Sequence, residues 1–136
     1  MRLGKALSMV LVIGLAAAQA QRAEKRTGEK SMENSAPLAC RIGALDATQR
    51  ARHKQLREEI RAGLQAVREL PDGYEFQLPA ETEVIKLAAE FITLERLCCP
   101  FFKFALEIGE EGKPLSLKLT GREGVKQFMQ VELGLK

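Results

Sequence analysis

The chain has 136 residues, with 21 Lys and Arg against 18 Asp and Glu, three cysteines and one histidine. This length supports one domain with a buried core and not two, and a hydrophobic content of 46% excludes wholesale disorder. The basic residues are unevenly distributed, because residues 38–136 contain 15 bases and 15 acids and the excess lies in residues 1–37. A neutral folded part lacks the basic face that a nucleic-acid-binding domain needs, so we expect no nucleic-acid partner.

The first 20 residues have the pattern of a secretory signal peptide. Arg2 and Lys5 precede an uncharged apolar run over Ala6–Ala17, and Ala18-Gln19-Ala20 gives a small-x-small cleavage site. A retained membrane anchor is the alternative, but the run is shorter than the roughly 20 residues that a bilayer requires. We therefore predict an exported protein, periplasmic or secreted, that has no membrane attachment after cleavage.

Residues 21–37 contain one large apolar side chain, Met32, among charged and small polar residues. Such a segment cannot bury enough apolar surface to order itself, so we interpret it as a flexible charged linker. The predicted organisation is then a signal peptide over 1–20, a linker over 21–37 and one domain over 38–136.

The first half of the domain is predicted to contain two strands and one helix. A short extended stretch over Cys40–Leu45 precedes Asp46 and Gln49, a capping-box pair that opens a helix. Apolar residues recur along this helix at helical spacing, at Leu56, Ile60, Leu64 and Val67. The predicted helix runs to Leu70 and is ended by Pro71-Asp72-Gly73. Alternation over 74–78 then predicts a strand with one buried face.

The second half is predicted to contain two helices and a hairpin. A helix over Thr82–Cys99 ends at Pro100, because the residue before a proline is held in an extended conformation. Alternating residues over 102–108 and 115–119 flank a glycine-bearing loop and predict an antiparallel hairpin. Thr120 and Glu123 form a second capping-box pair, which predicts a last helix with Val125, Phe128 and Met129 facing inward.

These elements predict an α+β fold in the order β-α-β-α-β-β-α. Helices would cover one face of a small, mostly antiparallel sheet. A ferredoxin-like arrangement is one candidate for this order.

An odd number of cysteines in an exported domain needs an explanation, because thiols in an oxidising compartment tend to pair. Cys98 lies on the apolar stripe of its helix and is expected to be buried, whereas Cys99 follows at the helix end. A bond between these neighbours would close a strained ring. Cys40 with Cys99 or with Cys98 is the more plausible disulfide, and it would stabilise the fold by about 2–4 kcal/mol.

The alternative interpretation is a metal-binding cluster formed by Cys40, Cys98 and Cys99. Soft thiolates select Zn(II), Cu(I) and, by the same softness argument, Hg(II) or As(III). His53 could complete a tetrahedral Cys3His site suited to zinc. The spacing matches no standard zinc module, and the C-x-x-C of thiol oxidoreductases is absent.

His53 also has a purely structural interpretation, as a half-buried side chain on the apolar helix face that is satisfied by a neighbour. With one histidine and no serine-centred motif, a nucleophilic triad has no basis. Gly121 and Gly124 lack the remaining pattern of a phosphate-binding loop. We therefore expect a protein that is not an enzyme.

Three segments resemble a group of small bacterial proteins marked by an ERLCCPFF…LTGREGVK signature. The segments are ELPDGYEFQLP (Glu69–Pro79), AEFITLERLCCPFFKFALE (Ala89–Glu107) and LKLTGREGVKQF (Leu117–Phe128). In this resemblance the adjacent cysteines of the group fall on Cys98 and Cys99, its leading cysteine on Cys40 and its Arg-His pair on Arg52 and His53. It implies a shared fold and cysteine site, and it transfers no activity.

Two functions follow as hypotheses. The first is an exported protein that binds a soft metal or metalloid through Cys40, Cys98 and Cys99, with His53 as a further ligand. The second is a disulfide-stabilised structural or interaction module that binds a protein partner and no metal.

Overall fold

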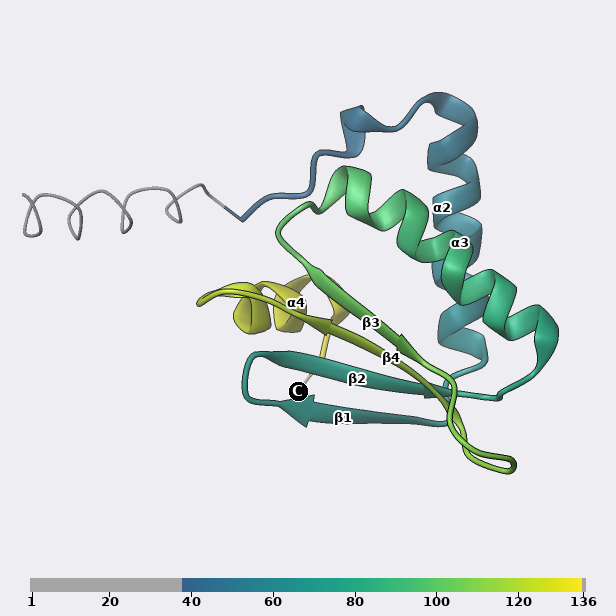
Figure 1. Cartoon of the computed structure of the whole chain (residues 1–136). Coiled ribbons are helices and arrows are strands. Elements are labelled where there is room, and N and C mark those ends of the chain that lie inside the picture. The colour runs from purple at the N-terminus through teal and green to yellow at the C-terminus, as the bar shows by residue number, and fades with distance from the viewer. Residues whose placement is uncertain (1–37, 136) are drawn as a thin grey trace, which may run out of the picture. The chain divides into compact units, whose positions relative to one another are not determined.

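The computed structural model describes residues 38–135, which form an α+β unit with a four-stranded antiparallel sheet (Figure 1). The α+β prediction is confirmed. The predicted signal peptide and linker lie outside the described residues. Within residues 38–135, none of the helices combines the length and apolar character needed to cross a membrane.

The elements follow one another along the chain as a short 3-10 helix, three α-helices and four strands. They are η1 (Ile42–Ala44), α2 (Ala47–Ala62), β1 (Ala66–Leu70), β2 (Gly73–Leu78), α3 (Thr82–Cys98), β3 (Lys103–Glu107), β4 (Leu115–Thr120) and α4 (Val125–Leu133). The sheet order is β1-β2-β4-β3. From β2 to α4 the chain follows the first five elements of the ferredoxin-like order β-α-β-β-α-β, but the edge strand beside β2 is β1, which precedes them.

The predicted strand over Cys40–Leu45 is wrong. This segment forms η1, and it bonds to the end of α3 and not to a sheet edge, because the Arg41 N–H donates to the Cys98 carbonyl at 2.6 Å. Leu45, predicted as part of the strand, is buried against Cys98 and Cys99. The apolar character of this segment therefore reflects packing against the end of α3 and not alternation across a sheet.

The predicted helix from Asp46 is correct at its start and wrong at its end. Asp46 and Gln49 form the expected capping box, with the Gln49 N–H donating to Asp46 at 2.8 Å. The helix stops at Ala62 with Gly63 as its C-cap, and Val67 belongs to β1. The apolar residues beyond Gly63 have helical spacing, but the pairing of β1 with β2 determines their conformation.

Pro71 and Asp72 form the two-residue connection of the β1–β2 hairpin, since Leu70 pairs with Gly73. The turn signal that we expected to end a helix therefore joins two strands. The hairpin predicted between residues 102 and 119 is confirmed as β3–β4. The capping box predicted for Thr120 and Glu123 is wrong, because α4 begins after Gly124, a left-handed residue without a side-chain cap.

One face of the sheet carries the core. Register places Tyr74, Phe76 and Leu78 beside the apolar residues of β4 on that face. All three α-helices cover it: residues of α2 and α3 join Phe76 in one buried cluster, and Gln130 of α4 donates to the Tyr74 hydroxyl at 2.9 Å. The other face is polar, as illustrated by the Ser116 hydroxyl donating to Glu75 at 2.6 Å.

We predict that Gly73→Ala disrupts the pairing of β2 with β4, because a Cβ at residue 73 would collide with the carbonyl oxygen of Leu119 and lie 2.8 Å from the Thr120 Cα. These are backbone atoms of the paired strand and cannot rotate away. The free energy of unfolding in urea should fall by about 3 kcal/mol. Gly43→Ala is the matched control, because a Cβ there meets nothing within 4 Å. Equal stability of the two variants would contradict this account.

Candidate functional site

The candidate site lies where α2 crosses the C-terminal half of α3. The buried residues of α3 are Ala88, Phe91, Glu95 and Cys98. Their spacing places Glu95 on the same stripe as Phe91 and Cys98, so the helix directs a carboxylate into the interior. Glu95 is only 8% exposed, and a buried carboxylate is stable only with polar partners.

His53 supplies the first of these partners from α2. Its Nε2–H donates to the Glu95 carboxylate, and the residue is only 4% exposed. The ring also stacks on Phe91, with ring centroids 5.9 Å apart. The prediction of a histidine satisfied by a neighbour is therefore confirmed, with an acidic residue of the other helix as the neighbour. The side chain is buried, however, and not half-buried as predicted.

An ion pair joins the same two helices nearer the solvent. The Arg52 guanidinium donates to both carboxylate oxygens of Glu90, at 2.8 and 2.6 Å. This bidentate bond raises the pKa of Arg52 and lowers the pKa of Glu90. The Arg-His pair of α2 thus meets two glutamates of α3, one at the surface and one in the interior.

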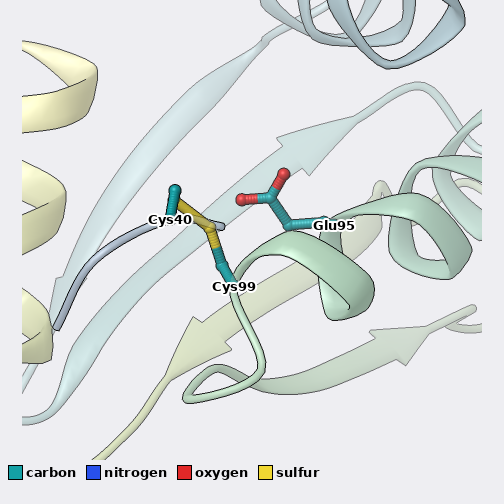
Figure 2. A group of neighbouring side chains, drawn as sticks. All are labelled: Cys40, Glu95 and Cys99. Carbon is teal, nitrogen blue, oxygen red and sulfur yellow. A yellow bond between two sulfur atoms is a disulfide. The ribbon is translucent and has the colours of Figure 1, made fainter. Parts of the chain in front are cut away.

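Cys40 and Cys99 form a disulfide, with their Cα atoms 4.8 Å apart (Figure 2). Cys99 ends α3, where its N–H still donates to the Glu95 carbonyl at 2.7 Å. Cys40 is exposed, whereas Cys99 is fully buried. Of the two pairings that the sequence left open for Cys40, the structure contains the one with Cys99.

Cys98 is the free cysteine among residues 38–135, and its side chain is buried as predicted. Its Sγ lies 3.8 Å from the Cys99 Sγ and 3.9 Å from a carboxylate oxygen of Glu95. Burial, reinforced by the negative charge of Glu95, raises the pKa of this thiol to about 11. Cys98 is therefore a protonated thiol at neutral pH and a poor nucleophile.

Two groups of potential metal ligands share Glu95. Cys40, Glu95 and Cys99 form one group, and His53, Glu95 and Cys98 form the other; within each group the ligand atoms lie within 4.8 Å of one another. Figure 2 shows the carboxylate of Glu95 beside the Cys40–Cys99 bond. Each of the four sequence-predicted ligands thus belongs to one of two groups around Glu95, and neither group contains all four. The sulfurs of Cys40 and Cys99 are bonded to each other.

Sequence reasoning missed Glu95, which is the centre of the arrangement. The signal was present, because a glutamate four residues after Phe91 and three before Cys98 must lie on the apolar face. A charge at such a position indicates a buried partner or a ligand site, and the single histidine of the chain was the available partner.

We predict that Cys40→Ser lowers the free energy of unfolding by about 4 kcal/mol, because the disulfide closes a loop with a sequence separation of 59. Urea unfolding followed by circular dichroism measures the change. The wild-type protein in excess reductant should have the same free energy of unfolding as the variant. Cys98→Ser keeps the disulfide and should not show this loss of stability. A variant as stable as the oxidised wild type would show that the bond adds nothing.

We predict that Cys98 in the oxidised protein ionises near pH 11. Because the unfolded chain loses this proton near pH 9, the thiol makes folding less favourable as pH rises from about 9 to 11. Glu95→Gln removes a negative charge and should lower the pKa, whereas Glu90→Gln should leave it unchanged. The carbon-13 chemical shift of the Cys98 Cβ reports each titration. An unchanged midpoint in Glu95→Gln would contradict the electrostatic cause.

Comparison of the chain with protein-family models, with curated proteins and with solved structures found no match. The resemblance to proteins with the ERLCCPFF…LTGREGVK signature therefore stays a prediction.

Proposed function

We propose that the chain is an exported protein whose reduced form binds one soft metal ion, Zn(II) or Cu(I). Cys40, Cys98 and Cys99 supply thiolates, and His53 or Glu95 completes the coordination. The observation that carries this proposal is the clustering of the two ligand groups around Glu95, with ligand atoms within 4.8 Å in each. Thiolates and imidazole together are typical ligands of these ions.

The spacing of the adjacent thiols supports the proposal. Two thiolates bound to tetrahedral zinc, each at about 2.3 Å, stand about 3.8 Å apart. The Sγ atoms of Cys98 and Cys99 are separated by 3.8 Å. These two ligands therefore need little rearrangement to share one ion.

The charges around Cys98 favour a cation and oppose a free thiolate. Burial and the carboxylate of Glu95 keep the thiol protonated, with a pKa of about 11. A metal ion takes the place of that proton, and the same carboxylate then attracts the ion. Binding should therefore release protons and strengthen as pH rises through the neutral range.

The disulfide and the metal site exclude each other, because Cys40 and Cys99 use the same sulfur atoms for both. Cys40 is exposed, so a dithiol reductant can attack its Sγ, releasing Cys99 as a thiolate that takes up a proton. The second thiol of the reductant then displaces Cys40 and closes the reductant's own disulfide. The oxidised chain would bind metal weakly and the reduced chain strongly.

The disulfide itself favours a second candidate function. In an oxidising compartment the bond persists, and the domain would serve as a disulfide-stabilised interaction module without metal. The two functions differ in the thiols of the mature protein. Intact mass and a free-thiol count on protein taken from its own compartment would distinguish them.

We predict that the reduced protein binds one equivalent of Zn(II), measured by competition with a chromophoric chelator under anaerobic conditions. Cys98→Ser and Cys99→Ser should each weaken binding by about 100-fold, because each removes a ligand. Affinity should rise about tenfold per pH unit for each thiol proton released. Cu(I) competition with a colorimetric chelator applies the same test to the second ion.

Glu95→Gln and Glu90→Gln form a matched pair of controls on one helix. Glu95 lies in both ligand groups, whereas Glu90 pairs with Arg52 outside them. Weaker binding in Glu95→Gln alone would support the site. If the reduced wild-type protein binds neither ion, the metal function is wrong and the disulfide-stabilised module is the better account.

A further inference from the structure

A largely apolar cavity of about 110 Å³ lies between the sheet and the three α-helices. Its walls include Phe76 on β2, Phe91 on α3, Phe102 after α3, and Met129 and Leu133 on α4. An apolar cavity of similar size, about 150 Å³, stays dry and binds benzene in an engineered protein. A group of phenyl size or smaller is therefore the occupant that this cavity suits.

The cavity borders the proposed metal site. Cys40 and Glu95 both lie on its wall, and both belong to the ligand group that includes Cys99. Phe102 contributes to the cavity wall and also packs against the buried pair Cys98 and Cys99. A centre held by the sulfurs of Cys40 and Cys99 would therefore have the apolar cavity directly beside it.

This juxtaposition distinguishes between two kinds of soft ligand. Arg57, Arg61, Glu95 and Glu132 also lie on the wall, but its phenyl and aliphatic side chains offer no ligand to a bare metal ion. A metalloid with one organic substituent has a thiophilic centre and an apolar group on the same molecule. Its substituent would bury apolar surface in the cavity while its centre binds the thiols.

We propose that the reduced site prefers an organic arsenic(III) compound, with its aryl group in the cavity, over inorganic arsenic(III); this inference rests on the proposed thiolate site. The dihydroxy form of the compound condenses with the Cys40 and Cys99 thiols. Two As–S bonds form, two As–O bonds break, and the hydroxyl groups leave as two water molecules with the thiol protons. Arsenic stays trivalent, so no oxidant or reductant takes part in this step.

The test compares phenylarsine oxide with sodium arsenite on the reduced full-length protein, with affinities measured by competition against a small dithiol. Leu133→Trp fills the cavity from α4 and should weaken phenylarsine oxide binding by about 10- to 100-fold, while arsenite binding stays within about twofold. Val131→Trp is the matched control, because Val131 lies on the same helix and is 81% exposed. It should change neither affinity.

Leu64→Trp is a second variant, which enters the cavity from the segment after α2. It should reproduce the selective loss of phenylarsine oxide binding. The test therefore still holds if Leu133→Trp fails to fold. Unchanged phenylarsine oxide binding in both variants, or equal loss of both compounds, would overturn the preference. If the reduced wild-type protein binds neither compound, the proposed thiolate site itself fails.

Discussion

The carboxylate of Glu95, buried on the apolar stripe of α3, is the constraint around which the site is organised. A buried carboxylate without partners costs several kcal/mol, so α2 must present a donor at that point. His53 does so, and its ring also packs on Phe91. Two polar contacts thus join the crossing helices, the buried one at Glu95 and the Arg52–Glu90 pair nearer the solvent. The free thiol of Cys98 lies beside the buried contact.

The same carboxylate links the two chemical states that the cysteines can take. In the oxidised chain it lies beside the Cys40–Cys99 bond and helps to keep Cys98 protonated. In the proposed reduced, metal-bound chain it would neutralise part of the charge of a cation. A single buried charge thus disfavours a reactive thiolate, and in the proposed metal-bound form it would attract the ion.

Local patterns predicted the elements in which alternation or a capping pair was decisive, such as β2, the β3–β4 hairpin and the start of α2. They failed over 40–45 and 63–70, where short apolar runs take their conformation from distant partners: the end of α3 in one case and β2 in the other. The cysteine and histidine positions were predicted as one site, but Glu95 was not. The spacing of Glu95 from Phe91 and Cys98 indicated its burial, but no local period reveals its contact with His53, 42 positions away.

The disulfide has a mechanical consequence as well as a chemical one. Cys40 lies two residues from the start of the described chain, and its bond leads to the end of α3. Tension on the preceding chain would therefore pass through the disulfide to the end of α3. This force would not detach η1 from α3. Once the bond is reduced, the Arg41 N–H to Cys98 contact and the burial of Leu45 would be left to resist the same force. The oxidation state of one cysteine pair would thus determine where the domain begins to yield under load.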